Sequence, residues 1–500
     1  MSINKTLVLG ISNIGLSFIF ASYIYTEWGY DFGDYYATAM HMFNNDYQLY
    51  TEAFQSKGPI YFIFIGLISA FIGWGYQQAH IVLSLTIALY IFSSWKLTDL
   101  FKYEFIYKLF LVCIFTIPLI SLDSNSSIAL FTVSLTNFGV YYLFIFFEKL
   151  NTPSFKKNNI LIFNKSILIF FIAFLTRIDT LIYLLPSFLV YIYALYLKKL
   201  QFNFLLKNFL IMLAFLTIIF CLIFYSLNIN IDDFLYLNFS FNVWYKENLL
   251  TDGSLFYRPD QFLFLMKTFL FPLSVLILFF VTLFDNKLKN SVLQKNKFYL
   301  SMIIFMCAFI ALIYARSDKV YHALIIVTPM ILFCSLFFDY LRAFFEQRFK
   351  RVLYYVFILI LGINIYGIYP GLVNIINNSQ NGFEQPKQYK EANEFISNYN
   401  IKYILGNDGW ISVFSKNLNE KPINSILNEH FYRWDNYFDH EYIRKSHNLL
   451  IGKNNEYFLI DRQLLISTQI YGNNQNFKEI ISVSSKITSG DFYDLYVIAN

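Results

Sequence analysis

The sequence Asp31-Phe-Gly-Asp34-Tyr35-Tyr36-Ala37 places two carboxylates directly after an apolar segment, Leu7 to Tyr25. That segment has about the length that a helix needs to cross the hydrocarbon core of a bilayer. We interpret this stretch as a polar loop, so Asp31 and Asp34 are expected where the chain meets a membrane surface, and an uncompensated charge is costly there. Because this placement asks for a functional reason, Asp31 and Asp34 are the candidate catalytic residues.

The composition is that of an integral membrane protein. Of 500 residues, 57% are hydrophobic and only 14% are charged, which is too little polar surface to cover a soluble globule of this size. The net charge is only +5 and the basic residues are scattered among turns, which argues against a nucleic-acid partner. The four cysteines lie within apolar segments without metal-ligand spacing, so we interpret them as small buried hydrophobic residues.

Apolar runs long enough to cross a membrane recur as far as residue 369. Two of them are separated only by Arg177-Ile-Asp179-Thr180, which predicts two helices joined by a turn. The predicted crossings are 7–25, 80–97, 106–121, 128–147, 166–176, 180–197, 208–227, 262–284, 298–314, 323–341 and 352–369.

The distribution of Lys and Arg predicts the orientation, because short loops rich in these residues stay in the cytoplasm. One set of alternate turns holds 19 of them, and the opposite set holds six. A single path satisfies this bias only if residues 59–74 form a juxtamembrane or re-entrant helix that makes no net crossing. We therefore expect about 11 crossings, a cytoplasmic N-terminus, and an extracytoplasmic location for the first polar segment and for everything after Tyr369.

The last part of the chain has a different character, because Asn, Gln, Lys and Glu replace the long apolar runs. Residues Glu384 to Tyr399 have helical spacing, and three short runs read as strands: Lys402 to Gly406, Tyr457 to Asp461 and Phe492 to Ile498. The predicted fold is thus a membrane all-α bundle over residues 1–372, with a small α/β extracytoplasmic domain over residues 373–500.

Acidic and basic groups occur together on the predicted outer side, which suits chemistry on a lipid-borne substrate. A carboxylate in a partly desolvated cavity can act as a general base, and Asp31 or Asp34 is placed to do so. Basic groups opposite can stabilise a phosphate leaving group. The candidates for binding substrate or phosphate are Lys57, Asp123, Arg177, Arg258, Arg316 and His322.

The first polar segment resembles a known family. The spacing Asp31-x-x-x-Tyr35, then Met42-Phe43 and Lys57-Gly-Pro59 at the start of an apolar helix, resembles the first outer loop of GT-C glycosyltransferases that use polyprenyl-phosphate sugars. That superfamily includes the protein O-mannosyltransferases and the aminoarabinose transferase that acts on lipid A. The resemblance continues in Asp123, in Leu175-Thr-Arg177 leading to Pro186, in the outer loop 228–261 and in Tyr321-His322.

The resemblance implies a function and a location. It implies an inverting transferase of the bacterial inner membrane that moves a hexosyl or pentosyl group from an undecaprenyl-phosphate type of carrier to an acceptor outside. That acceptor would be a lipid, a glycan or a protein of the cell envelope, as in polysaccharide or lipopolysaccharide modification. Register through Tyr35 makes Asp31 the base and Asp34 its neighbour. Ser56 stands where the family often has an acid, so a divalent cation at Asp31 and Asp123 remains open and no cofactor is certain.

Other interpretations remain for these residues and for the whole chain. Asp31 and Asp34 suit a helix cap, Lys57 suits an interfacial anchor, and Arg177 with Asp179 suits a structural ion pair as well as it suits donor binding. Among functions, an O-antigen type of polymerase or ligase also joins lipid-linked glycans on the outside. A lipid or glycan transporter is a third class, although the expected repeat symmetry and midplane charges are not visible in this sequence.

Overall fold

A computed structural model of the chain describes a defined set of residues. These are residues 13, 15, 17, 30–44, 48–50, 57–101, 105–116, 127–240, 296–315, 324–345, 362, 387–399, 401, 403–405, 457–462, 478 and 481–498. The chain divides into two compact units. The first comprises residues 1–27, 83–221 and 243–380, and the second comprises 28–82, 222–242 and 381–500.

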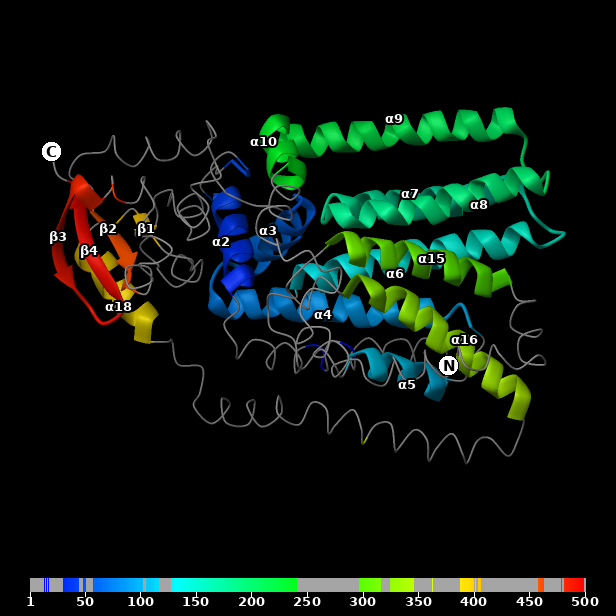
Figure 1. Cartoon of the computed structure of the whole chain (residues 1–500), viewed down its shortest axis with the longest axis horizontal. Helices are drawn as coiled ribbons and strands as arrows, with labels where there is room; N and C mark the ends of the chain where they lie inside the picture. Colours follow the sequence, from blue (N-terminus) through cyan, green and yellow to red (C-terminus); the bar gives the residue numbers. More distant parts are fainter. Residues whose placement is uncertain are drawn as a thin grey trace. The chain divides into compact units, whose positions relative to one another are not determined.

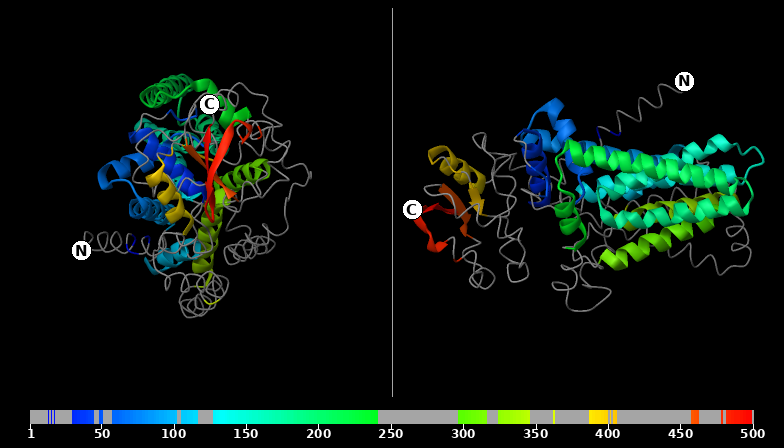
Figure 2. Two further views of the ribbon diagram at one scale, coloured as in Figure 1. Left: turned by 90° about the vertical axis from the view of Figure 1, so that its left-hand side faces the viewer. Right: turned by 90° about the horizontal axis from the view of Figure 1, so that it is seen from above.

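Long apolar helices that lie alongside one another make up the first unit (Figures 1 and 2). Five segments of the described chain are long and apolar enough to cross a membrane, namely Gln77–Thr98, Ser127–Leu150, Lys157–Phe174, Ile178–Tyr196 and Phe202–Ser226. The protein is thus a multi-pass membrane protein. Its long helices are α4 (Tyr76–Thr98), α5 (Phe105–Thr116), α6 (Ser127–Leu150), α7 (Ile160–Phe174), α8 (Leu184–Tyr196), α9 (Phe202–Ser226), α15 (Asn296–Ala315) and α16 (Val327–Phe345).

Eight of the eleven predicted crossings coincide with these eight helices. The predicted turn between residues 176 and 180 is confirmed, because α7 ends at Phe174 and a 3₁₀ helix, η4 (Ile178–Tyr183), leads into α8. The predicted crossings 7–25, 262–284 and 352–369 lie outside the described residues, apart from the helical positions 13, 15, 17 and 362.

Helix α7 begins at Ile160, six residues before the predicted start, so this prediction was too short. The polar residues at the start of the helix have partners on its neighbours. Asn164 and Asn208 of α9 exchange amide hydrogen bonds of 3.0 Å, and the Lys165 ammonium lies 5.9 Å from the ring centroid of Tyr142 on α6. Paired polar side chains allow a helix to continue where the sequence alone indicates a loop.

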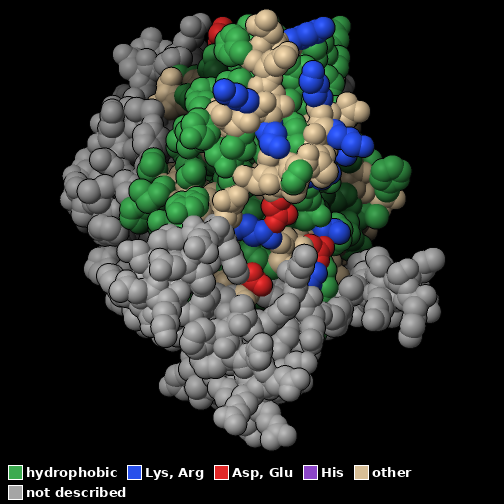
Figure 3. Space-filling view, turned by 90° about the vertical axis from the view of Figure 1, so that its right-hand side faces the viewer, with side chains coloured by type: hydrophobic (Ala, Val, Ile, Leu, Met, Phe, Trp, Pro, Cys, Tyr) green, Lys and Arg blue, Asp and Glu red, His purple; other side chains and the backbone are tan. Residues whose placement is uncertain are grey.

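Lysines gather at one end of the first unit (Figure 3). Several contacts bring residues of different turns together at this end. Lys297 forms an ion pair with Glu148 at 2.5 Å and also bonds to the carbonyl of Leu100, while Lys199 donates to the carbonyl of Thr152 at 3.2 Å. These lysines come from turns that the charge count assigns to the cytoplasm. The turn that carries Arg177 joins the other ends of α7 and α8.

A buried amide joins three helices inside this unit. Asn137 of α6 is fully buried and donates to the hydroxyls of Ser93 and Ser94 on α4, at 3.2 and 3.3 Å. Its side-chain oxygen accepts a 2.8 Å hydrogen bond from Thr328 of α16. Polar side chains in a membrane interior are tolerated when they bond to one another, so this amide fixes the relative register of α4, α6 and α16.

Thr328→Val removes the hydroxyl that bonds to Asn137 and preserves the shape of the side chain. The buried amide oxygen then loses its partner, and we expect the free energy of unfolding to fall by about 1–2 kcal/mol. Thr217→Val is the matched control, because Thr217 is exposed on α9 and bonds only to the carbonyl of Leu213 in its own helix. Unfolding of the purified variants in detergent measures both effects, and equal stability of the two variants would contradict the role given to Asn137.

The first polar segment is helical, which corrects its interpretation as a loop. It forms α2 (Tyr30–Asn44), which packs against α3 (Ile60–Ile72) in the second unit. The aromatic and small residues Phe32, Tyr35, Tyr36 and Ala39 recur at helical spacing and are buried. This apolar face, hidden among polar residues, is the physical reason for a helix here.

Helix α3 has 13 residues, which is fewer than the about 20 that cross a bilayer, and this length suits the predicted juxtamembrane helix. It begins after Pro59 and ends at Gly73, whose φ of 87° favours glycine. Gly66 allows close packing, since a Cβ there would overlap the ring of Phe43 on α2. The start of the predicted outer loop 228–261 is also helical, with α10 (Ile231–Leu235) followed by a π-helical turn, η5 (Tyr236–Ser240).

The C-terminal residues form a small α/β arrangement, as predicted. Helix α18 (Lys387–Asn398) accompanies a four-stranded mixed sheet in the order β1-β2-β4-β3. Strand β1 pairs in parallel with β2, and the other pairs are antiparallel. The strands are β1 (Tyr403–Leu405), β2 (Tyr457–Asp461), β3 (Ser484–Ser489) and β4 (Tyr493–Ile498).

The strands β1, β2 and β4 confirm the three predicted strands, whereas β3 was missed. The sequence of β3, Ser-Ser-Lys-Ile-Thr-Ser, is mostly exposed and has no apolar alternation. The turn before β4 is held by α18, because the Glu391 carboxylate accepts hydrogen bonds of 2.8 to 2.9 Å from the backbone of Asp491, Phe492 and Tyr493. The predicted domain boundary at residues 372 and 373 stays a prediction.

Candidate functional site

The two candidate carboxylates lie at the start of α2. Asp31 and Asp34 are one turn apart, and positions three residues apart lie on the same side of a helix. The Asp34 side chain is half-buried. The helix dipole favours negative charge near the start of a helix, and an ionised carboxylate can accept a proton from a bound substrate.

Aromatic contacts with the α3 region hold α2 in place. The Tyr36 hydroxyl accepts hydrogen bonds from the Ser69 hydroxyl at 3.4 Å and from the Gly75 backbone at 3.3 Å, and its ring meets Trp74 edge-on at 5.5 Å. Burial raises the pKa of Tyr36, against the lowering effect of these two hydrogen bonds. Tyr36 is thus a neutral anchor that fixes the helix carrying both carboxylates.

His41 lies two turns after Asp34 on the same helix and is buried. Burial lowers the pKa of its imidazole from 6.5 to about 4, because the charged form loses hydration. The unfolded chain therefore binds a proton between pH 6.5 and 4 that the folded chain does not. Stability is fully present above pH 6.5 and is lost as the pH falls toward 4.

His41→Gln removes this titration and is expected to flatten the dependence of stability on pH between 6.5 and 4. The shift from 6.5 to about 4 corresponds to about 3 kcal/mol between these pH values in the unsubstituted protein. Thermal unfolding at pH 7.5, 6, 5 and 4 measures the slope. If the variant and the unsubstituted protein lose stability in parallel, the buried neutral state of His41 is wrong.

Tyr50 and Lys57 are joined within the second unit. Tyr50 is fully buried and donates a 2.6 Å hydrogen bond from its hydroxyl to the backbone carbonyl of Lys57. Its ring meets Phe234 edge-on at 5.3 Å. Burial raises the pKa of Tyr50 well above 10, while a hydrogen bond with the Asn238 side chain acts in the other direction. Tyr50 is therefore a neutral hydrogen-bond donor at any physiological pH.

The backbone of Tyr50 is in the left-handed region, with a φ of 72°. A bulky residue rarely adopts this conformation, which costs on the order of 1–3 kcal/mol and persists only where the surroundings enforce it. No residue type at this position signals the conformation, because glycine, asparagine and aspartate are the residues expected there. Lys57 itself is half-buried and lies in the turn before Pro59.

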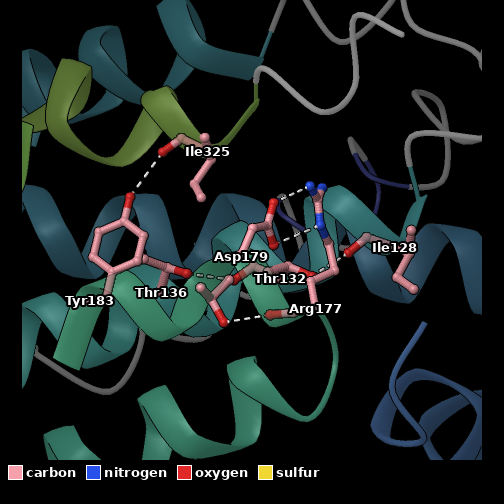
Figure 4. A network of polar contacts seen from close by, with 8 residues as sticks. Ile128, Thr132, Thr136, Arg177, Asp179, Tyr183 and Ile325 are labelled. Carbon is pink, nitrogen blue, oxygen red and sulfur yellow. Dashed lines mark hydrogen bonds and ion pairs between the residues drawn. The ribbon is translucent and has the colours of Figure 1, made fainter. Parts of the chain in front are cut away.

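Arg177 and Asp179 form an ion pair in the first unit, at the turn between α7 and η4 (Figure 4). The guanidinium contacts both carboxylate oxygens, with Nε 3.2 Å from Oδ1 and Nη2 bonded to Oδ2. The Arg177 side chain is only 7% exposed and that of Asp179 is 16% exposed. The ion-pair interpretation from the sequence is thus confirmed, whereas donor binding by Arg177 stays a prediction.

The turn carrying this pair is tied to the start of α16. Thr180 donates to the carbonyl of Arg177 at 2.8 Å, and the hydroxyl of fully buried Tyr183 donates to the carbonyl of Ile325 at 2.9 Å (Figure 4). The Tyr183 ring stacks on Phe170 of α7 with centroids 5.8 Å apart. These contacts hold in place the turn that carries Arg177 and Asp179.

The structure brings together some of the predicted residues and does not describe others. It joins Arg177 to Asp179 and places Asp31 and Asp34 on one helix. It adds Tyr36, Tyr50 and Tyr183 as buried tyrosines that hold these segments. The candidates Asp123, Arg258, Arg316 and His322 lie outside the described residues.

A metal site is not tested by the structure. Within the residues described, no group of three or more His, Cys, Asp or Glu side chains is placed to hold a metal ion. Asp123, one half of the pair considered for a divalent cation, lies outside that part of the chain. A divalent cation at Asp31 and Asp123 thus stays a prediction.

Comparison with solved structures identifies the fold. The chain matches the crystal structure of ArnT from Cupriavidus metallidurans in the apo state with a TM-score of 0.58, 11% sequence identity and coverage of 100% of both chains. ArnT bound to undecaprenyl phosphate matches with a TM-score of 0.50, 10% identity and coverage of 99% of both chains. The archaeal oligosaccharyltransferase AglB from Archaeoglobus fulgidus, in complex with an inhibitory peptide and a dolichol-phosphate, matches with a TM-score of 0.52, 10% identity and coverage of 94% of this chain and 72% of its own.

The resemblance seen in the first polar segment is therefore confirmed at the level of the fold, over the whole chain. No family model matches the sequence. No curated protein matches it either.

Proposed function

We propose that this membrane protein, which has the fold of ArnT, is a glycosyltransferase. It would move a sugar from a polyprenyl-phosphate carrier to an acceptor outside the cytoplasm. The observation that carries this proposal is the match to ArnT over the full length of both chains. Fold alone is an analogy, so the proposal also needs a site that fits the chemistry. The carboxylates at the start of α2 and the basic residues of the predicted outer turns supply it.

The reaction would be a direct displacement at the anomeric carbon of the sugar. The acceptor oxygen forms the new bond to this carbon while the bond from the carbon to the phosphate oxygen breaks. The acceptor proton passes to a carboxylate, and the electron pair leaves on the lipid phosphate. One displacement inverts the configuration. The protein must therefore hold a base on one side of the sugar and positive charge around the phosphate.

The candidate residues are assigned the following roles in this reaction. Asp31 is the general base and Asp34 supports it. Lys57 binds the donor phosphate, and the other candidates for binding substrate or phosphate are Asp123, Arg177, Arg258, Arg316 and His322. The ion pair with Asp179 holds the Arg177 guanidinium in one orientation, which is a useful property for a group that binds a phosphate oxygen.

The lysine-rich end of the first unit supports an orientation in which the turn carrying Arg177 faces outward. Lysines at this end belong in the cytoplasm, and the Arg177 turn lies at the opposite ends of α7 and α8. In this orientation the proposed enzyme lies in a bacterial inner membrane and takes its donor from the outer leaflet. Its acceptor is a lipid, a glycan or a protein of the cell envelope.

Asp31→Asn tests the catalytic assignment. The purified protein is incubated in detergent with radiolabelled undecaprenyl-phosphate sugars and an extract of envelope glycans and lipids as acceptors. We expect sugar transfer by the unsubstituted protein and a loss of about 10²- to 10⁴-fold in the Asp31→Asn variant, because general-base catalysis contributes this much. For Asp34→Asn we expect a smaller loss.

Asp232→Asn is the matched control, because Asp232 is an exposed carboxylate in the first turn of α10 in the same unit. It should transfer sugar at the unsubstituted rate. Unchanged transfer by the Asp31 variant would remove Asp31 from the mechanism. If no polyprenyl-phosphate sugar is consumed by the unsubstituted protein, the proposed enzyme class is wrong.

A further inference from the structure

We propose that Tyr50 is a positioning residue that sets the place of Lys57 and thereby the affinity for a lipid-linked phosphate. This inference rests on the proposed function, since it assigns to Lys57 the binding of the donor phosphate. The observations that carry it are the burial of Tyr50, its left-handed backbone and its hydrogen bond to the carbonyl of Lys57.

The hydrogen bond acts on the backbone of Lys57 and not on its ammonium group. The Tyr50 hydroxyl lies 2.6 Å from the Lys57 carbonyl oxygen, seven positions later in the sequence. A lysine side chain is a flexible stem of four carbons, so its ammonium group can contact a phosphate from many directions. Fixing the carbonyl of the same residue restricts where the side chain starts, so the ammonium reaches a smaller volume and loses less entropy when it binds.

A short turn follows Lys57, with Gly58 and Pro59 before α3 begins at Ile60. A buried tyrosine hydroxyl supplies a donor from outside the turn. The Lys57 carbonyl is thus held by a side chain that is itself fixed.

Tyr50 is fixed by contacts with the segment that follows α9. Its ring meets Phe234 edge-on at 5.3 Å, and its hydroxyl is hydrogen-bonded to the side chain of Asn238. Asn238 is buried and donates to the carbonyl of Phe234 at 3.2 Å, and the Phe234 ring meets Phe224 edge-on at 4.9 Å. Lys57 is therefore coupled through Tyr50 to α10 and to the π-helical turn after it.

The left-handed backbone of Tyr50 argues against a role in packing alone. If the side chain only filled space, an ordinary backbone conformation would hold it at a lower conformational energy. If only the left-handed backbone mattered, glycine would adopt it at a lower conformational energy. Non-glycine residues in this conformation concentrate at functional sites, where the strain sets a geometry that an unstrained chain would not hold. Here the conformation directs the ring into the cluster with Phe234 while the hydroxyl reaches Lys57.

A double-mutant cycle between Tyr50→Phe and Lys57→Met tests this inference. The probe is undecaprenyl phosphate, and its dissociation constant is measured for the full-length protein in detergent. We expect Tyr50→Phe to weaken binding about tenfold and Lys57→Met to weaken it more. The double variant should bind as weakly as Lys57→Met alone, because the hydroxyl acts only through Lys57.

Tyr90→Phe is the matched control. Tyr90 is also buried, and its hydroxyl also donates to a backbone carbonyl, that of Phe115 at 3.0 Å, but it lies on α4 in the membrane bundle. Tyr90→Phe should lower thermal stability about as much as Tyr50→Phe and leave the dissociation constant unchanged. A general effect of losing a buried hydroxyl would change binding in both variants and would overturn the inference.

Asn238→Ala provides a second variant if Tyr50→Phe folds poorly. It removes the amide that bonds to the Tyr50 hydroxyl and keeps the tyrosine, and we expect a smaller loss of affinity that again disappears in the Lys57→Met background. Unchanged binding by Tyr50→Phe, or a tenfold loss that persists in the Lys57→Met background, overturns the inference alone. Failure of the unsubstituted protein to bind undecaprenyl phosphate overturns the proposed function and this inference with it.

Discussion

The hydrocarbon interior of a membrane offers no hydrogen-bond partners, and this constraint shapes the first unit. Backbone groups are satisfied within helices, so the apolar segments fold as α4 to α9, α15 and α16. The polar side chains that remain inside must bond to one another. Asn137 forms hydrogen bonds with Ser93, Ser94 and Thr328. Asn164 forms them with Asn208. These few polar contacts fix how the helices align, because apolar packing alone is less specific.

Because charged side chains are costly inside the membrane, they lie at the ends of the helices, where they can contact a substrate. Lysines occupy one end of the first unit, and the Arg177–Asp179 pair lies in the turn between the opposite ends of α7 and α8. In the second unit, buried tyrosines hold the segments that carry Asp34 and Lys57. Tyr36 anchors α2 and Tyr50 anchors the turn before α3. The segments that carry Asp34 and Lys57 are thus each held by a neutral, buried tyrosine.

Much of the fold was predictable, because its signals are long and local. The apolar runs predicted α4 to α9, α15 and α16, and the apolar strands of the last domain predicted β1, β2 and β4. Helix α2 was missed because its apolar face, formed by Phe32, Tyr35, Tyr36 and Ala39, lies among polar residues. Strand β3 was missed because an exposed edge strand needs no apolar pattern. The geometry of Tyr50 was beyond prediction, since its left-handed backbone is enforced by contacts distant in sequence.

We propose that a lipid phosphate binds beside Lys57 with the sugar toward the start of α2. A cryo-electron microscopy structure of the protein in nanodiscs with undecaprenyl phosphate is the most direct test of this placement. We expect density for the phosphate within ion-pair distance of the Lys57 ammonium, on the side of Asp31 and Asp34. Phosphate density at another place in the molecule, with Lys57 turned away from it, would rule out this binding mode.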